Sequence, residues 1–273
     1  MRTSRLGSLT LTATTLFLII FVHPARGQEP FRLIPECRFL FGMDWGYVWA
    51  NGDMVIPAGG RPGSGSRVDA SNLGIDQTEA TTVFLKASIL QNHLLETDFF
   101  TVSPTGQRKI QAPFIFQGQT YDQDTPLETR VDIGWFRICY GYKAFTLASS
   151  YLAPRIGLHH VRLGATINGE NKDGALLSNT RRLDGTYPVL GVEARHSFPY
   201  GMDLSMELEG MHLITRGFVT LLNIAGDWEV HPDVTLRVGV FARVCNWTED
   251  NQPLNNEWTL SLAGFSTGVS FGF

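Results

Sequence analysis

Histidine and carboxylate side chains are the residues of this chain that could carry catalysis or bind a metal. A hydrolytic site would need a histidine or carboxylate base beside a nucleophile or an activated water. His159 and His160 are neighbours, so on a strand they would point to opposite faces and could not bind the same metal. His212 and Glu209 lie three residues apart, which on a strand also separates their side chains. The remaining histidines beyond the first 27 residues are His93, His196 and His231.

The three cysteines add no recognisable site. The spacings of Cys37, Cys139 and Cys245 match no zinc or disulfide framework. A hydrolytic grouping of acid, histidine and serine residues is not found either. The sequence therefore predicts no catalytic residues, no metal site and no cofactor, and it leaves the role and pairing of the cysteines open.

Composition excludes several classes of protein. The 273 residues include 22 Lys and Arg against 26 Asp and Glu, so no basic surface for nucleic acid is expected. Aromatic residues make up 11% and charged residues only 18% of the chain, which argues against intrinsic disorder. The mean hydropathy of −0.03 excludes a membrane protein built from many apolar helices. A membrane protein that crosses the bilayer with strands is still allowed by these figures.

Residues 1–27 have the pattern of a secretory signal peptide: a positively charged start, an apolar run over residues 9–22 and small residues at the end. The run is shorter than the ~20 apolar residues that a membrane-spanning helix needs, which argues against an uncleaved anchor. We expect cleavage before Gln28. Residues 28–273 then form a single exported domain.

Alternation with a period of two residues is the main structural signal of this domain. Between Arg38 and Ala50 one face is large and aromatic, whereas the other is small or charged. This pattern is typical of a transmembrane strand with lipid outside and a polar lumen inside. The large face consists of Phe39, Phe41, Met43, Trp45, Tyr47 and Trp49.

Four further segments alternate in the same way: residues 127–137, 190–195, 202–210 and 234–245. In each of them we assign the apolar residues to the lipid and the charged residues to the lumen. In residues 127–137 this assignment places Leu127, Val131 and Trp135 outside and Glu128, Arg130 and Asp132 inside.

Connection lengths give a strand count. Short and long connections alternate in eight of nine places, as in bacterial outer-membrane barrels, which have short periplasmic turns and longer outer loops. The long ones are expected at residues 51–79, 102–126, 163–185 and 247–256. We therefore predict an all-β fold, a single antiparallel transmembrane β-barrel of about ten strands, with eight or twelve as alternatives. The strands are expected near residues 38–50, 80–91, 93–101, 127–141, 144–162, 186–197, 202–213, 218–230, 234–246 and 257–273.

The last strand carries a resemblance to a known family. In residues 264–273 the side chains of Val269, Phe271 and Phe273 face one way, and the chain ends on an aromatic residue. This segment resembles the C-terminal strand of bacterial outer-membrane β-barrel proteins. The resemblance implies an address in the outer membrane, with Val269, Phe271 and Phe273 as the assembly signal that the barrel insertion machinery engages.

Two internal segments, residues 130–137 and 187–192, are also similar to hairpin segments of small porin-like outer-membrane barrels. That family implies a fold and a location but no activity. The partners that it implies are outer-membrane lipid, the insertion machinery and periplasmic chaperones, while an external ligand stays undefined.

Charged residues of both signs are expected to face the lumen, where they can pair. From this we predict a structural or surface-interaction scaffold with a salt-bridged lumen, which displays the loops at 51–79, 102–126 and 163–185. A narrow porin-like channel for ions or small solutes is the alternative, and an outer-membrane hydrolase is the least favoured reading. The predicted lumen residues are Asp44, Lys86, Glu128, Arg130, Asp132, Arg155, Glu193, Arg195, Asp203, Glu207, Glu209, Asp227, Arg237 and Arg243.

Overall fold

The computed structural model describes five stretches of the chain, and the predicted signal peptide at residues 1–27 lies outside them. The described stretches are residues 37–55, 66–170, 174–213, 217–251 and 254–273.

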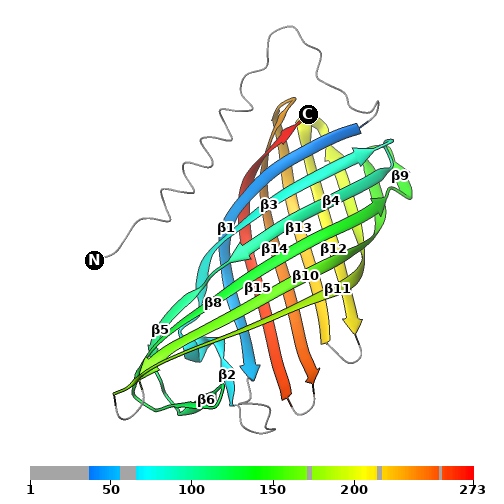
Figure 1. Cartoon of the computed structure of the whole chain (residues 1–273). Coiled ribbons are helices and arrows are strands. Elements are labelled where there is room, and N and C mark those ends of the chain that lie inside the picture. Colours follow the sequence, from blue (N-terminus) through cyan, green and yellow to red (C-terminus); the bar gives the residue numbers. More distant parts are fainter. Residues whose placement is uncertain (1–36, 56–65, 171–173, 214–216, 252–253) are drawn as a thin grey trace. The chain divides into compact units, whose positions relative to one another are not determined.

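Ten long strands in these stretches close into one antiparallel barrel (Figure 1). Each strand pairs with the next along the chain, β8 pairs directly with β10, and β15 returns to pair with β1. The predicted ten-stranded barrel is therefore confirmed. The strands are β1 (Cys37–Val55), β3 (Gln77–Ile89), β4 (His93–Val102), β8 (Pro126–Tyr142), β10 (Ser150–Glu170), β11 (Leu176–Phe198), β12 (Met202–Leu213), β13 (Gly217–His231), β14 (Val234–Asn251) and β15 (Leu254–Gly272).

The two ends of the barrel differ in their connections. One end, here called the short-turn end, carries Cys37, the C-terminal Phe273 and the turn with η2 (Pro199–Gly201). The other end, the loop end, carries smaller elements between the long strands. These are β2 (Arg67–Asp69), η1 (Ala70–Leu73), β5 (Thr105–Lys109), β6 (Phe114–Phe116) and β7 (Gln119–Tyr121), whereas β9 (Phe145–Leu147) lies at the short-turn end.

Two of the predicted loops, at residues 163–185 and 247–256, are mostly strand. In the second, β14 continues to Asn251, which lies opposite Leu254 of β15. We expected a long connection over residues 163–185, but β10 and β11 stay paired without interruption from Ser150 opposite His196 to Glu170 opposite Leu176. The two strands therefore project as a long hairpin at the loop end (Figure 1). We expected the two strands to end at residue 162 and begin at residue 186, but outside lipid a strand can continue with polar residues on its outer face.

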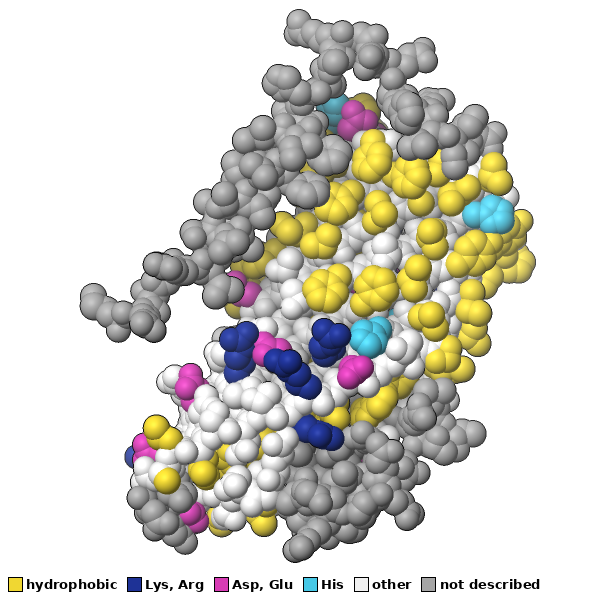
Figure 2. Space-filling view, viewed as in Figure 1, with side chains coloured by type: hydrophobic (Ala, Val, Ile, Leu, Met, Phe, Trp, Pro, Cys, Tyr) yellow, Lys and Arg dark blue, Asp and Glu magenta, His cyan; other side chains and the backbone are white. Residues whose placement is uncertain are grey.

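The outer surface of the barrel is apolar over a broad belt (Figure 2). Large side chains that would be buried in a soluble protein stand exposed on neighbouring strands, as the alternation predicts. Such a belt suits the hydrocarbon of a bilayer, since every backbone polar group of a closed barrel is paired within the sheet. Belt residues include Met43, Trp45, Tyr47, Trp49, Leu204, Met206, Leu208, Leu236, Val238 and Val240. In the described stretches, no helix has the length and apolarity to cross a membrane.

Along the first half of β8 our assignment of the two faces is wrong, because the apolar residues face inward and the charged residues face outward. Leu127, Val131 and Trp135 are buried inside, and Arg130 and Asp132 are on the outer surface. Arg130 is ion-paired to Asp132 at 2.9 Å there. The assignment failed because this half of β8 lies at the loop end, where apolar side chains fill the barrel and the outer surface is polar.

Closure of the barrel depends on the pairing of β1 with β15. Phe273 exchanges two backbone hydrogen bonds with Phe39, at 3.0 and 3.1 Å, and the two rings stack with centroids 5.8 Å apart. Further along, Asp44 lies opposite Gly268. The terminal aromatic residue thus completes the seam between the first and last strands.

A substitution at Gly268 tests the pairing of β1 with β15, because a Cβ at this position would collide with the Asp44 carboxylate and the backbone oxygen of Met43. We expect Gly268→Ala to destabilise the folded barrel by about 1 to 3 kcal/mol, the usual cost of overpacking. The measurement is the urea midpoint of the barrel in detergent. In the control Gly226→Ala, the added Cβ has its nearest neighbour 3.9 Å away, at the backbone oxygen of Val238. An equal loss in both variants would contradict the steric argument.

Candidate functional site: a buried ion network in the lumen

The interior of the barrel holds a cluster of charged side chains from six strands. Alternation along each strand turns these residues inward, and the register places some of them directly opposite one another. Lys86 lies opposite Glu96, and Asp98 lies opposite Arg137. We call the following set the central network: Lys86 on β3, Glu96 and Asp98 on β4, Arg137 on β8, Arg155 and His159 on β10, Glu193 on β11, and Glu207 and Glu209 on β12.

Arg137 lies at the middle of the central network. Its guanidinium contacts four carboxylates: Nη2 is 2.6 Å from Glu96 Oε1, and Nη1 is 3.1 Å from both Glu207 Oε2 and Glu209 Oε1. The fourth contact joins Nε to Asp98. The Arg137 side chain is only 4% exposed. A guanidinium buried to this extent is tolerated only because its donors are satisfied by opposite charges.

Arg155 is a second bridge between the same acidic residues. Its guanidinium is 2.8 Å from a carboxylate oxygen of Glu96 and from one of Glu193, and Nε is 2.9 Å from Glu209 Oε1. Lys86 Nζ completes the layer, 3.0 Å from Glu96 and 3.1 Å from Glu207. The contacts cross the lumen and tie distant strands together.

A second group of ion pairs lies nearer the short-turn end. Arg237 pairs with Asp227 at 2.7 Å and lies 4.0 Å from Asp44. Arg195 pairs with Asp203 at 2.6 Å and lies 3.5 Å from Asp227. These five residues come from β1, β11, β12, β13 and β14, so they add three strands, β1, β13 and β14, to the six of the central network.

Arg243 adjoins the central network on the side of the apolar core. It lies 3.5 Å from Asp98 and is stacked on the rings of Phe100 and Trp135, whose centroids are 4.4 and 5.5 Å from its guanidinium carbon. Cation–π contact of this kind stabilises a desolvated guanidinium. Arg243 therefore marks the boundary between the ion network and the apolar part of the interior.

The predicted lumen residues divide into two sets. Glu128, Arg130 and Asp132 are on the outer surface of β8, which corrects their assignment to the lumen. The structure places the other eleven in the interior, where they take part in the contacts above.

Sequence reasoning missed Glu96, Asp98 and Arg137. The signal for Arg137 was present, because it alternates with the apolar residues Phe136, Ile138 and Tyr140, which are exposed on the outer surface.

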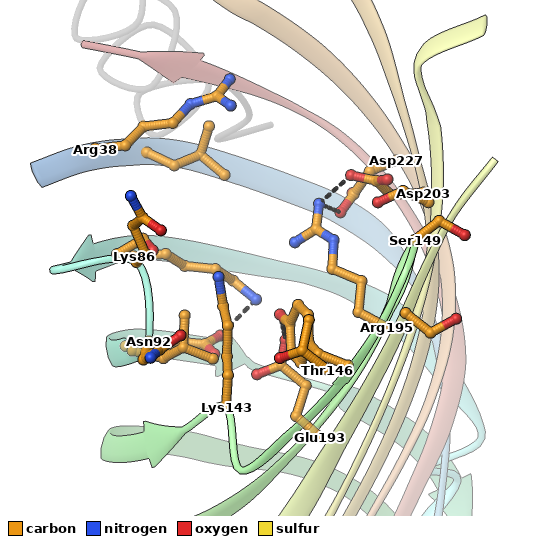
Figure 3. Close-up of a pocket in the computed structure, with 18 of the residues that line it drawn as sticks. Arg38, Lys86, Asn92, Lys143, Thr146, Ser149, Glu193, Arg195, Asp203 and Asp227 are labelled. Carbon is orange, nitrogen blue, oxygen red and sulfur yellow. Dashed lines mark hydrogen bonds and ion pairs between the residues drawn. The ribbon is translucent and has the colours of Figure 1, made fainter. Parts of the chain in front are cut away.

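A cavity of about 500 Å³ occupies the short-turn end of the lumen. Figure 3 shows Lys86, Lys143 and Glu193 at its wall, with Arg195 beside Asp227. Lys143 lies outside the strands, in the connection after β8, with its ammonium 5.0 Å from the centroid of the Tyr151 ring. Burial and the nearby Arg195 guanidinium lower the pKa of the Lys143 ammonium.

Deeper in the barrel the free space is small. Among the side chains of the ion network there is a cavity of about 30 Å³, and another of about 30 Å³ lies toward the loop end. Each has room for about one or two water molecules. The loop half of the interior is an apolar core, which includes Val48, Phe100, Ile133, Trp135, Val161, Tyr187, Val219 and Leu262.

The histidines are not gathered at one site. His159 Nε2 contacts Glu209 at 2.8 Å inside the lumen, whereas His93 and His196 contact the hydroxyls of Tyr140 and Ser150, each at 2.7 Å. His212 stacks on Phe218.

Comparison with solved structures agrees with this architecture. The outer membrane protease OmpT from Escherichia coli matches with a TM-score of 0.57 and 10% identity, covering 90% of this chain and 99% of that one. The fold is that of a bacterial outer-membrane β-barrel. The short-turn end of such a barrel faces the periplasm and the loop end faces outward.

Two other outer-membrane barrels match with lower TM-scores. The Pseudomonas putida toluene transporter TodX has a TM-score of 0.34 and 11% identity, covering 88% of this chain and 90% of that one. Ail, the attachment invasion locus protein of Yersinia pestis, has a TM-score of 0.36 and 7% identity, covering 86% of this chain and 99% of that one. No protein-family model matches the chain, and no curated protein sequence does.

Arg137 can be compared with Arg130, seven residues earlier on the same strand. We expect Arg137→Met to destabilise the barrel by about 3 to 5 kcal/mol, because four buried carboxylates lose their shared partner. Arg130→Met removes an exposed ion pair and should cost about 0 to 1 kcal/mol. The measurement is equilibrium unfolding in urea in lipid vesicles. Similar losses in the two variants would show that the central network does not stabilise the fold.

Proposed function

We propose that this protein is a non-conducting outer-membrane scaffold that holds an ordered surface extension at the loop end. The observation that carries the proposal is the filled interior. From the periplasmic side a solute meets the layer of Lys86, Arg137 and Arg155 with their carboxylate partners, and beyond it the apolar core. A path for ions would require buried charge pairs to separate in a low-dielectric interior, at a cost of several kcal/mol.

The packing of the loop end supports a role in presenting a surface to a partner. Phe114, Phe116 and Tyr121 of the β6–β7 hairpin are buried in the same apolar core as the barrel strands. Tyr121 donates a hydrogen bond to the backbone oxygen of Ile167 on β10 and accepts one from Asn179 on β11. The connection after β4 is thereby held against the β10–β11 hairpin. A segment ordered in this way presents a defined surface to a partner outside the cell.

The channel reading and the enzyme reading are weaker alternatives. A channel is favoured only by the periplasmic cavity, which ends at the ion network. The likeness to a protease barrel concerns the fold alone at 10% identity. We therefore propose a non-enzymatic protein whose partner binds at the loop end.

A conductance measurement distinguishes the proposed scaffold function from the channel function. We expect purified protein inserted into a planar lipid bilayer to give no discrete conductance steps, since the ion network and the apolar core block the lumen in series. A heat-modifiable shift on SDS gels serves as the control that the sample is a closed barrel. Discrete steps whose size changes in Arg237→Gln or Arg243→Gln would establish the channel and overturn the scaffold proposal.

Exposure at the cell surface tests the display role. Gly174, between β10 and β11, has open space around it, and Tyr200, in the turn before β12, is 94% exposed. An epitope inserted after Gly174 should bind antibody on intact cells. The same epitope after Tyr200 should bind only after the outer membrane is permeabilised. The opposite result would show that the short-turn end faces outward, and the loop end would then not be at the cell surface.

A further inference from the structure

Cys139, His159 and Glu209 meet inside the barrel although they come from β8, β10 and β12. Glu209 Oε2 lies 2.8 Å from His159 Nε2 and 3.3 Å from Cys139 Sγ. The three candidate ligand atoms all lie within 4.8 Å of one another. The three residues are fully buried, with exposed fractions of 0 to 1%. A thiol, an imidazole and a carboxylate converging on one point are the donor types that zinc takes in proteins.

The neighbouring strands leave room for these side chains. Gly157 lies opposite Cys139, and Gly191 lies opposite Glu209. A Cβ at Gly157 would collide with Cys139 Sγ, and one at Gly191 would crowd Glu209 Cγ. Two glycines therefore give the thiol and the carboxylate their space. The His159 ring is packed edge to face with Trp135, with centroids 5.8 Å apart.

The spacing fits a small tetrahedral ion. Ligands at zinc bond lengths of about 2.0 to 2.3 Å in tetrahedral geometry are separated by about 3.3 to 3.6 Å. The sulfur–oxygen separation already has this value, and the nitrogen–oxygen separation needs to open by about half an ångström. Three protein ligands leave the fourth position for a water molecule, because the second oxygen of Glu209 is ion-paired with Arg137 and Arg155.

The charge of the surroundings also suits a cation. The described residues around the site contribute five carboxylates (Glu96, Asp98, Glu193, Glu207 and Glu209) and four basic side chains (Lys86, Arg137, Arg155 and Arg243). One negative charge is left over. A divalent cation held by a thiolate adds one net positive charge and balances the cluster. A proton on His159 would balance it as well, so the two states compete for the same site.

We propose that Cys139, His159 and Glu209 bind one divalent transition-metal ion of the zinc class, which links β8, β10 and β12 across the lumen. On binding, the Cys139 thiol releases its proton to solvent and its sulfur bonds to the metal, with no change of oxidation state. The site is independent of the proposed scaffold function. It differs from our sequence-based expectation that the chain has no metal site.

The test is metal binding during refolding. Protein unfolded in urea with chelator is desalted and refolded in detergent with Zn²⁺, then desalted again and analysed for bound zinc. We expect about one zinc per chain. Refolding with Co²⁺ should give the near-ultraviolet charge-transfer absorption of a cobalt–thiolate bond. Wild-type protein that binds less than about a tenth of an equivalent, or that lacks this absorption, overturns the proposal.

Matched variants identify the ligands. Cys139→Ser and His159→Asn should lower metal affinity by about tenfold or more. Cys245→Ser removes a different buried thiol, which contacts the Tyr187 hydroxyl, and His160→Asn removes the adjacent histidine, which contacts Thr186. These two control variants should bind the metal with the same affinity as the wild-type protein. Heat-modifiable migration on SDS gels verifies the fold of each variant, and retention of the cobalt–thiolate absorption in Cys139→Ser overturns the assignment even if zinc is bound.

Discussion

The burial of Arg137 among four carboxylates is the interaction on which the interior of this barrel depends. Its partners reach it from β4 and β12, on either side of the lumen. A buried charge left without such partners would cost several kcal/mol, so each strand must hold its register for the others to be satisfied. Slipping one strand by a single residue would turn its charges toward lipid. The network thus specifies the arrangement of strands as well as stabilising it.

The filled interior links the fold to the proposed role. A ten-stranded ring encloses only slightly more space than the smallest barrels, whose interiors side chains can fill. Here the filling changes along the axis, from a cavity of about 500 Å³ at the short-turn end to ion pairs and then to an apolar core. The apolar core continues into the packing of Tyr121 and its hairpin at the loop end. This packing connects the barrel to the surface that we propose it displays.

The contacts within the central network differ in how far they follow from the pairing of neighbouring strands. Lys86 pairs with Glu96, and Asp98 pairs with Arg137, across neighbouring strands. Each pair is set by strand register. The longer contacts, from Arg155 to Glu96 and from His159 to Glu209, join strands that are not neighbours and arise only when the ring closes. The meeting of Cys139 with His159 and Glu209 is of the same kind, which is why the spacing of cysteines and histidines along the chain suggested no metal site.

The sequence by itself determined the fold class and the number of strands, because alternation with a period of two residues marks strands and the connection lengths separate them. In β1 it also determined the outward face, since that face is large and aromatic. The contact of Phe273 with Phe39 across the seam comes from the structure alone. Only the tertiary structure decided that Arg130 and Asp132 face outward while Arg137 faces inward. The physical reason is that alternation assigns two faces but not their environments: at the loop end the inner face is apolar and the outer face is wet, the reverse of the order within the bilayer.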